Sequence, residues 1–482
     1  MLDPNLFADG ASSGEMQGDA VAALAKALEA GYGTDVSQLT GGAALRVQSL
    51  DTTMQAVIQE NEDFKLFNRL AKPKAGATVD EWTEQNGIGG FLGGSTNTET
   101  GTIEESTGSY ARRVGMVKFL MTKRQVSLVQ TLQNTLADSE ATEYNNGALE
   151  LLSNAEYLCF EGDDTVVPTE FSGIFAQMVQ GVADGHVDGG NIIDHEATSL
   201  DSIVPINKAA AQIRKFGNFG RLTDIYFSPL VQADLDNSLD PAFRVALNNA
   251  PNSIMLGTPV VGIRATGGNI GTTEDIFIRD EELQTPFELR YPTYAAKQVG
   301  LKPAAVAGVA AADAQSKFKA GHAGNYYYLV TGVNAKGQST GLISAQVAVG
   351  AGDKVTLSIT KSAAGEETGY VIYRSRKNGT NAVDDFREMV RIGRTGNTTT
   401  YVDYNRDIPG TTKAYLLDMR AGQTAINWRQ LLPMMKFQLF PNNQPVIPWA
   451  QLLFGYLRIT KRRHMAVIKN ILPNGAIWRP FN

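Results

Sequence analysis

A serine flanked by glycines is the first feature of this 482-residue sequence that could do chemistry. Residues 337–341 read GQSTG, which is the G-x-S-x-G spacing of a hydrolase nucleophile. That chemistry needs the serine on a tight turn between a strand and a helix, with a base close by. The string instead lies between two predicted strands, 326–333 and 343–349, and this context favours a hairpin loop. We therefore predict no catalytic residue at Ser339.

Histidines and carboxylates gather in one segment, DGHVDGGNIIDHE. It holds two of the four histidines near carboxylates, and the candidate ligands are His186, Asp188, Asp194, His195 and Glu196. Such side chains can bind a divalent metal. Their spacing fits no short metal-binding motif, however, and the density of Gly, Asp and Asn is typical of a surface loop. We predict a polar loop and no metal site.

Glycines at 87–90 and a single cysteine are the remaining candidates for cofactor or redox chemistry. The string GIGGFL at 87–92 resembles the start of a dinucleotide-binding loop, but Leu92 stands where the third glycine is required and no helical pattern follows. We interpret it as the tip of a flexible arm. Cys159 is the only cysteine, which excludes an intramolecular disulfide and a multi-cysteine metal site. We predict no cofactor and no enzymatic activity.

The most basic cluster of the chain consists of Arg458, Lys461, Arg462 and Arg463. A cluster of this kind can bind phosphate or an acidic partner surface. Several charges in a hairpin turn are also ordinary for a solvated loop. Both interpretations stay open, because residues 76–117 carry six acidic residues that the cluster could meet.

Composition and charge narrow the class of protein. Apolar residues make up 43% of the chain and charged residues 19%, which is typical of a globular protein. The net charge of −7 disfavours a dedicated binder of nucleic acid or anionic membranes, so we expect contact with DNA to be non-specific. The N-terminal sequence lacks a signal-peptide pattern, and no apolar run is long enough to cross a membrane. We expect a protein made in the cytoplasm that contacts no membrane.

The elements that would position these residues include a stretch with too few apolar residues to fold alone. Residues 76–117 are rich in Gly and Thr, contain no lysine, and show a strand-like return at 110–119. A long segment of this kind is usually functional or disordered, and an isolated pair of strands is marginally stable in water. We expect a two-stranded arm that is completed by another molecule.

Helical patterns lie on both sides of the arm. We predict a mobile segment at 1–44, helical parts at 45–70, and a helical block that starts near Val126. The strongest pattern predicts a long helix over 139–161, because apolar residues there step by four and three: Tyr144, Ala148, Leu151, Ala155 and Leu158. Residues 165–300 then alternate helix and strand patterns. The predicted elements are a helix with core face Ile206, Ala210, Ile213 and Phe216, a strand at 223–227, a helix that starts at Ser228-Pro229 with the serine oxygen as its cap, and strands at 254–263 and 275–279.

From 302 to 419 the pattern becomes all-β. Seven short strands separated by turn residues favour a β-sandwich. They are predicted at 326–333, 343–349, 354–360, 369–374, 389–394, 398–402 and 413–417. Mixed character returns in 420–482, with 452–459 and 465–471 as two buried strands or as one strand pair. We therefore predict that the sandwich is inserted into a larger α+β domain.

The order of these features resembles the major capsid proteins of tailed bacteriophages, which have the Hong Kong ninety-seven-type fold. Residues 45–300 and 420–482 carry the resemblance. The segment from GATVDEWTEQNG to GSYARRVGMVKF is similar to the extended loop of that family, and EATEYNNGALELLSNAEYLCFEG is similar to its spine helix. INKAAAQIRKFGNFGRLTDIYFSPLVQADLDN is similar to a further part of such subunits. The inserted segment resembles fibronectin type III or immunoglobulin-like modules through GYVIYRSRKNG, TTTYVDYN and YYYLVTGVNAKGQS.

The resemblance implies an N-terminal arm at 1–44, a capsid core with peripheral and axial domains at 45–300 and 420–482, and an inserted module at 302–419. It implies self-assembly into an icosahedral shell around double-stranded DNA, with copies arranged as hexamers and pentamers in the virion. Scaffolding, portal and decoration proteins would be separate partners. A tail or decoration protein is the nearer alternative, and a secreted carbohydrate-binding enzyme or adhesin is the more distant one.

The resemblance also assigns roles to residues of the arm. Trp82, Ile88, Phe91 and Leu92 would anchor it on a neighbouring subunit, while Arg112 and Arg113 would hold its base to that subunit's acidic side. Some capsids of this family join a lysine of the extended loop covalently to an asparagine. Residues 75–117 contain no lysine, so we expect a non-covalent contact.

Overall fold

The computed structural model describes residues 63–132, 138–238, 260–290, 299–420, 425–441 and 444–481. The chain divides into a smaller unit, Met1–Ile58 with Gln130–Ser139, and a larger unit that contains the rest. The elements described below belong to the larger unit, except for the end of the helix Leu128–Leu132 and the first residue of the helix Ser139–Glu161, which fall in the smaller unit. The predicted segment 1–44 lies outside the described residues. Of the predicted helical parts at 45–70, the described portion contains the short helix α3, Lys65–Arg69.

The predicted arm is a two-stranded antiparallel ribbon. Strand β1, Val79–Gly87, pairs with β2, Ser109–Met116, from Val79 opposite Met116 to Gly87 opposite Ser109. Strand β2 leads through Val117 directly into β3, Lys118–Ser127. The predicted helical block near Val126 is therefore wrong at its start, because Val126 pairs with Ile447 in a sheet. Helix α4, Leu128–Leu132, follows and is only five residues long.

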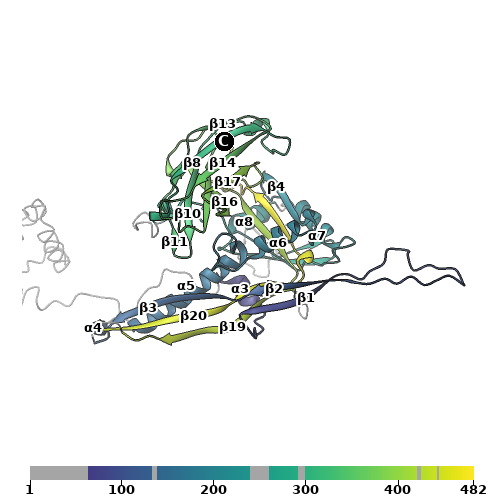
Figure 1. Ribbon diagram of the computed structural model, residues 1–482, viewed down its shortest axis with the longest axis horizontal. Helices are drawn as coiled ribbons and strands as arrows, with labels where there is room; N and C mark the ends of the chain where they lie inside the picture. The colour runs from purple at the N-terminus through teal and green to yellow at the C-terminus, as the bar shows by residue number, and fades with distance from the viewer. Residues whose placement is uncertain are drawn as a thin grey trace, which may run out of the picture. The chain divides into compact units, whose positions relative to one another are not determined.

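In one part of the larger unit, a long helix packs on a three-stranded sheet. The antiparallel sheet has the order β19, Ile426–Gln438, then β20, Val446–Ile459, then β3. Helix α5 spans Ser139–Glu161, as its four-and-three periodicity predicted. It lies against one face of the sheet, where the Gln451 amide donates to the Tyr144 carbonyl oxygen at 2.7 Å (Figure 1).

A second, six-stranded sheet is covered by helices on both faces. Its order is β4, Ile192–Thr198; β21, Ala466–Ile471; β18, Thr412–Leu417; β5, Asp224–Phe227; β7, Gly268–Glu274; and β6, Gly262–Ala265. Alternate residues of a strand point to opposite faces. Accordingly Ile225 and Phe227 pack with helices α7, Val204–Arg214, and α8, Pro229–Asn237. Tyr226 packs on the other face with α5 and α6, Ile174–Ala183.

Three local predictions in this region are wrong. Helix α7 ends at Arg214, and Phe216 is exposed beyond it rather than part of its core face. Helix α8 begins at Pro229 as predicted, but the Ser228 hydroxyl makes no capping hydrogen bond. The residues after Glu274 form turns, not a strand, and the strand β7 precedes them.

Residues 305–403 form strands in two main layers, and we call this part of the chain the sandwich. One layer has the order β17, Thr398–Asp403; β14, Asp353–Thr360; and β8, Ala305–Ala312. The other contains β11, Gly337–Gln338; β10, Tyr328–Asn334; β15, Gly369–Ser375; and β16, Phe386–Gly393, with β12, Leu342–Ile343, on β10. Strands β9, Gly324–Tyr326, and β13, Val347–Val349, form a separate pair. Apolar side chains from both layers fill the space between them.

Strand assignments at the two ends of this insertion differ from the prediction. The seventh predicted strand exists as β18, but it pairs with β5 and β21 in the six-stranded sheet and not in the sandwich. Strand β8 was missed because its sequence AVAGVAAA has few of the β-branched and aromatic residues that identify strands. Strands β20 and β21 are two separate strands, as the first of the two alternatives predicted, and the alternative of one strand pair is wrong because they belong to different sheets.

The remaining described helices are short. They are α9, Phe287–Arg290, and the 3-10 helices η4, Gly189–Asn191; η6, Val299–Leu301; η7, Ala320–His322; η8, Val383–Asp385; and η9, Arg462–His464. None of the helices in the described ranges is long and apolar enough to cross a membrane.

Residues 477–481 cross from the core to the sandwich. The indole N–H of Trp478 donates to the Asp385 carbonyl oxygen at 3.1 Å, and the Pro480 carbonyl accepts from the backbone N–H of Lys377 at 2.8 Å. The Phe481 ring stacks on His322 at 3.8 Å between ring centroids. The sandwich is thus held by this segment as well as by its two chain connections.

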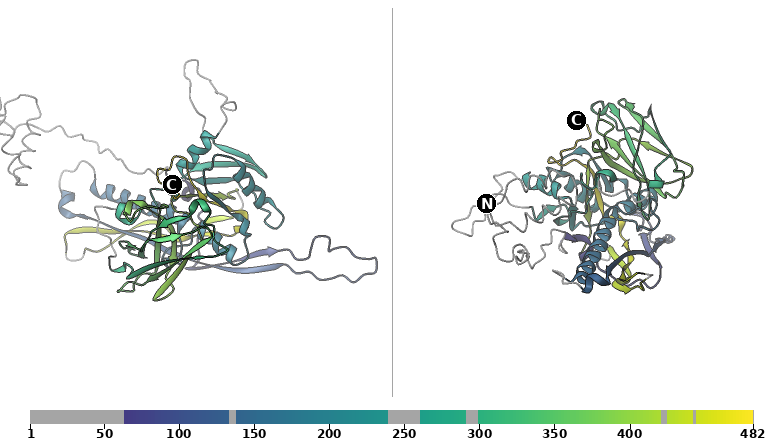
Figure 2. Two further views of the ribbon diagram at one scale, coloured as in Figure 1. Left: turned by 90° about the horizontal axis from the view of Figure 1, so that it is seen from above. Right: turned by 90° about the vertical axis from the view of Figure 1, so that its left-hand side faces the viewer.

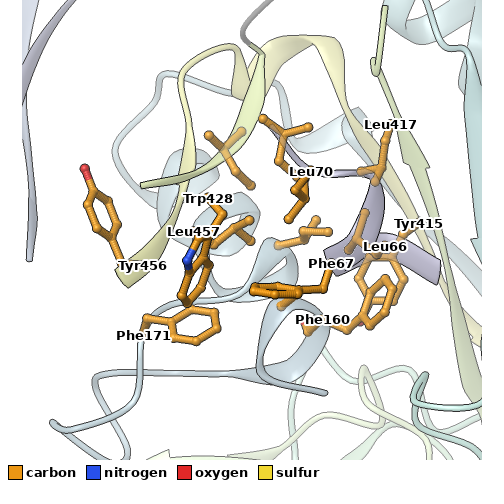
Figure 3. Close-up of a cluster of buried hydrophobic side chains, with 14 of the residues drawn as sticks. Leu66, Phe67, Leu70, Phe160, Phe171, Tyr415, Leu417, Trp428, Tyr456 and Leu457 are labelled. Atoms are coloured by element: carbon orange, nitrogen blue, oxygen red, sulfur yellow. Dashed lines mark hydrogen bonds between the residues drawn. The ribbon is translucent and has the colours of Figure 1, made fainter. Parts of the chain in front are cut away.

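The main core lies where the three-stranded sheet meets α3 and α5. Trp428 of β19 is fully buried, and the rings of Phe67 and Phe171 contact it edge-on, each at 5.1 Å between centroids (Figure 3). This core supports strands β19 and β20. Side chains of these two strands hold the arm.

Candidate subunit-interface arm

The base of the arm is fixed to the body of the same chain by the inward-facing row of β1. Because side chains alternate along a strand, Asp80, Trp82, Glu84 and Asn86 share one face, and they are less exposed than their neighbours. Trp82 packs against the main core. The Arg458 guanidinium lies 5.7 Å from the centre of its ring, which is within the range of a cation–π contact.

Asp80 is the most strongly bonded residue of this row. Its carboxylate accepts two hydrogen bonds from Arg429, at 2.8 and 3.0 Å, and one from the Tyr456 hydroxyl at 2.6 Å. Arg458 adds a longer contact at 3.4 Å. Burial alone would raise the pKa of Asp80, but the bonds from Arg429 and Tyr456 outweigh it and hold the pKa below its ordinary value.

Glu84 forms the second half of this attachment. Its carboxylate lies 3.4 Å from the Arg113 Nε and 3.7 Å from the Arg462 guanidinium, and it accepts the Trp82 indole N–H at 2.9 Å. Arg113 also pairs with Asp184 at 3.2 Å. Burial lowers the pKa of Arg462, and the charge of Glu84 partly offsets that effect. Arg113 thus holds the arm base to an acidic residue of its own chain.

The basic cluster meets the arm of the same chain. Arg463 donates to the Asn86 carbonyl oxygen at 3.0 Å and to the His186 carbonyl oxygen at 2.5 Å. With Arg458 on Asp80 and Arg462 on Glu84, three of its four predicted residues touch β1. Lys461 stands at the start of η9. We call the set Asp80, Glu84, Arg113, Arg429, Tyr456, Arg458, Arg462 and Arg463 the arm clamp.

Arg112 lies on the opposite row from Arg113. Its side chain is 74% exposed and lies 3.4 Å from Glu81 on the neighbouring strand. The sequence did not identify Asp80, Arg429 and Tyr456 as part of this site. Their contacts join residues 349 and 376 positions apart, so no local spacing could have indicated them.

The tip of the arm extends beyond the clamp, and its large apolar side chains are exposed. Ile88, Phe91, Leu92 and Ile103 are 87%, 77%, 77% and 90% exposed. Gly89 adopts a φ of +83°, which favours glycine, and a side chain there would collide with the Thr107 carbonyl. The tip is a long narrow ribbon that projects from the clamp (Figure 2).

A second exposed apolar surface lies on the three-stranded sheet, on the face away from α5. Cross-strand rows place Phe119 beside Phe454 and Leu432, and Met121 beside Leu452 and Met435. The rings of Phe119 and Phe454 contact edge-on at 4.9 Å. Phe119, Met121 and Phe437 are 50%, 62% and 52% exposed. We call this surface the outer sheet face.

The tip and the outer sheet face lie at opposite ends of one extended segment. Strand β2 runs from the tip to the clamp, and β3 continues from the clamp along the sheet (Figure 1). One end presents a narrow apolar ribbon and the other a broad apolar face. Within one chain these two surfaces point away from each other.

The other candidate residues from the sequence are engaged in ordinary structural contacts. Ser339 is buried, and its hydroxyl oxygen accepts the Gly332 N–H at 2.9 Å. The predicted polar loop is wrong at its second half, because Asp194, His195 and Glu196 lie in strand β4, which pairs with β21. Asp188, Asp194 and Glu196 pair with lysines at 2.5–2.6 Å. No group of three potential metal ligands occurs within the described ranges.

Comparisons with known proteins give structural similarity only. No family model matches the sequence, and no curated protein matches it. Among solved structures, the chain is similar to the SrpI encapsulin complex from Synechococcus elongatus, at 8% identity over 93% of this chain and 99% of that chain, with a TM-score of 0.42. It is also similar to the capsid of a native GTA particle, at 8% identity, 90% and 99% coverage, and a TM-score of 0.46. For Mycobacterium phage Adephagia the values are 9% identity, 89% and 92% coverage, and a TM-score of 0.41. Because all three scores lie below 0.5, we base the proposal that follows on the chain's own contacts.

Proposed function

We propose that this protein is a major capsid protein whose copies assemble into the icosahedral shell that encloses a double-stranded DNA genome. The observation that carries the proposal is the arm, which is clamped at its base and bare at its apolar tip. An exposed apolar surface that its own chain does not bury marks a site of association with another molecule. Two different surfaces on one chain form head-to-tail contacts, which close into rings or shells when the rotation permits.

The tip supplies enough apolar surface for a specific contact. Burying one Ile, Leu or Phe side chain stabilises by about 1.5–3 kcal/mol, so its four large side chains contribute roughly 6–12 kcal/mol per contact before association costs. The clamp reduces those costs, because it fixes the direction in which the tip leaves the body. The outer sheet face of a neighbouring copy is the surface of matching character. We therefore place Ile88, Phe91 and Leu92 in the contact between copies, and Trp82 and Arg113 in the clamp that aims them.

The contact is non-covalent in this proposal. Residues 75–117 contain no lysine, so the arm has no amine that could form an amide bond with a neighbour. The net charge of −7 supports a shell that holds DNA without specific recognition. We place the sandwich, from β8 to β17, on the outside of the shell, where an inserted domain does not obstruct the contact between copies.

Removal of the tip tests the proposal. Residues 88–107 are replaced by a two-residue Asn-Gly turn, so that β1, β2 and the clamp remain. We expect a folded, soluble subunit that forms no closed particles by negative-stain electron microscopy and elutes at low mass. The control replaces only Thr83, an exposed residue of β1, by Ser and should leave particles unchanged. Normal particles from the tip deletion would refute the role of the arm, and tubes or rings from the unaltered chain would refute the shell.

A further inference from the structure

A basic surface lies on helix α7 and on the loop that follows it. Residues 202–223 contain four cationic residues and no acidic residue, although the whole chain has a net charge of −7. The four are Lys208, Arg214, Lys215 and Arg221, and all of them are exposed. A local excess of positive charge attracts anions even where the net charge of the chain is negative.

Three of these four cations have no acidic partner. Lys215 pairs with Asp188 at 2.5 Å. Within the described ranges, no ion pair joins Lys208, Arg214 or Arg221 to a carboxylate. These three charges are therefore available to an anion from outside the chain.

The unpaired cations gather on one side of α7 and at the turn between β6 and β7. Lys208 and Arg214 lie on the helix face opposite its buried residues. The Arg214 side chain also lies beside Gly267 of the turn, and the Arg221 guanidinium lies beside Gly268, the first residue of β7. The three cations thus line one surface.

Two exposed aromatic rings stand among these cations. Phe216 and Phe219 are 68% and 59% exposed, and their rings contact edge-on at 5.0 Å between centroids. Phe219 has a φ of +54°, a left-handed conformation that is unfavourable for a bulky side chain. Backbone strain that is kept at an exposed residue points to a functional constraint.

The loop that carries the two rings is fixed to the body of the protein. Asn218, between the two phenylalanines, is buried, and its side-chain amide donates to the Gln212 carbonyl oxygen at 2.9 Å and to the Asn191 Oδ1 at 3.1 Å. The Gly220 N–H donates to the Ile213 carbonyl oxygen at 2.9 Å. The rings are held in one arrangement before any partner arrives, which lowers the entropy cost of binding.

We propose that this surface, which we call the α7 surface, binds the phosphate backbone of double-stranded DNA. Lys208, Arg214 and Arg221 contact phosphates, and the two phenylalanine rings pack against the sugars. Contacts of this kind position a protein on DNA without reading the base sequence.

DNA fits the α7 surface better than an acidic protein does. A duplex carries one negative charge per about 1.7 Å of helix axis, so it meets all three cations at once. The carboxylates of a folded protein are interspersed with cations, which leaves few of them free. The contact is a property of the single subunit, and it rests on the proposed function only for the choice of DNA as the anion.

The salt dependence of DNA binding tests the proposal. Fluorescence anisotropy measures binding of the full-length protein to a labelled duplex of about 20 base pairs, between about 50 and about 200 mM NaCl. Each phosphate contact contributes about −0.9 to the slope of log K against log[salt], so three contacts predict a slope of about −2.7 and a loss of affinity of about fortyfold over this range. Arg214→Gln with Arg221→Gln leaves one contact, with a slope of about −0.9 and a loss of about 3.5-fold. An unchanged slope in this variant, or no binding of the unaltered protein at about 50 mM salt, overturns the proposal.

Lys302→Gln with Lys336→Gln is the matched control. Both lysines are exposed, and they lie outside the α7 surface, the first directly after η6 and the second between β10 and β11. This variant removes the same amount of charge as the arginine variant and should keep the steep slope. A slope reduced as much as in the arginine variant would show that DNA responds only to the net charge, and would overturn the α7 surface as the site.

Phe216→Ser with Phe219→Ser separates the rings from the charges. It should weaken DNA binding by the same factor at every salt concentration and leave the slope unchanged. An unchanged affinity would refute the contact of the rings with DNA.

Poly-glutamate and vesicles of anionic phospholipid are the probes for other partners. Binding of either probe that is as tight as DNA binding, and that is lost with the two arginines, overturns the assignment to DNA. If closed particles hide the α7 surface, the same series is run on Phe91→Asp with Leu92→Asp subunits. Subunits that do not bind DNA, from a protein that forms normal particles when unaltered, refute the DNA contact alone and leave the shell in place.

Discussion

Replacement of Asp80 by Asn removes the central charge of the arm clamp and should loosen the arm without unfolding the body. Asn keeps one acceptor oxygen but cannot hold both donors of Arg429 and the Tyr456 hydroxyl with the same strength. Removing one partner of a fully buried ion pair costs about 3–5 kcal/mol, and an exposed pair contributes about 0–1 kcal/mol. The side chains of Asp80 and Arg429 are 12% and 16% exposed, which places this pair between those limits. We therefore expect a loss of about 2 kcal/mol, or about thirtyfold in the opening equilibrium of the arm.

Hydrogen exchange of peptides from β1 and β2 measures this opening directly. Asp80→Asn should exchange about thirtyfold faster in these peptides, while peptides from α5 and β15 should be unchanged. Arg112→Gln is the matched control, because it removes a salt bridge of the same ribbon whose side chains are 74% and 49% exposed. It should change exchange by less than about threefold. Equal exchange in the two variants would show that the clamp does not hold the arm.

Three further predictions address acid, the core and the tip. The pKa of Asp80 is lower in the folded protein than its ordinary value, so the stability that Asp80 gives the arm is complete above pH 3.8 and is lost as the pH falls through the folded pKa. Hydrogen exchange should therefore show the arm of the unaltered protein opening in acid. Asp80→Asn should show no such pH-dependent step. Trp428→Ala should cost about 3–5 kcal/mol in urea unfolding because it empties a fully buried site, whereas Phe437→Ala, at 52% exposure, should change stability little. Phe91→Asp with Leu92→Asp should leave the melting temperature of the subunit unchanged and abolish particles in electron micrographs, and normal particles would contradict the apolar role of the tip.

Local patterns in the sequence predicted the elements whose periodicity is strong. The four-and-three spacing from Tyr144 to Leu158 predicted α5, and the alternation and turn residues predicted most strands of the sandwich. Weak patterns gave wrong predictions where contacts with distant parts of the chain determine the local secondary structure. Val126 lies in a strand because β20 offers a paired partner, and Phe216 stays exposed because α7 ends before it. β18 has the residues of a sandwich strand, but its neighbours in space are β5 and β21.

The candidate site was predictable in part. The shortage of apolar residues in 76–117 indicated an arm, and the basic residues 458–463 allowed either a solvated turn or a contact with an acidic surface. The sequence could not show that these two features belong together within one chain. Asp80 and Arg429 meet because the three-stranded sheet brings β19 beside the start of the arm.

The segment 477–481 has a consequence for exchanging domains. An insertion joined by two connections can be replaced by another domain whose ends lie equally close together. Here Trp478 is 4% exposed and Phe481 stacks on a histidine of the sandwich, so a replacement would leave two aromatic side chains without their binding surfaces. A substitute domain must therefore reproduce that docking surface, or the segment must be shortened with it. The sandwich and the final segment of the chain are expected to change together among related proteins, as one inherited unit.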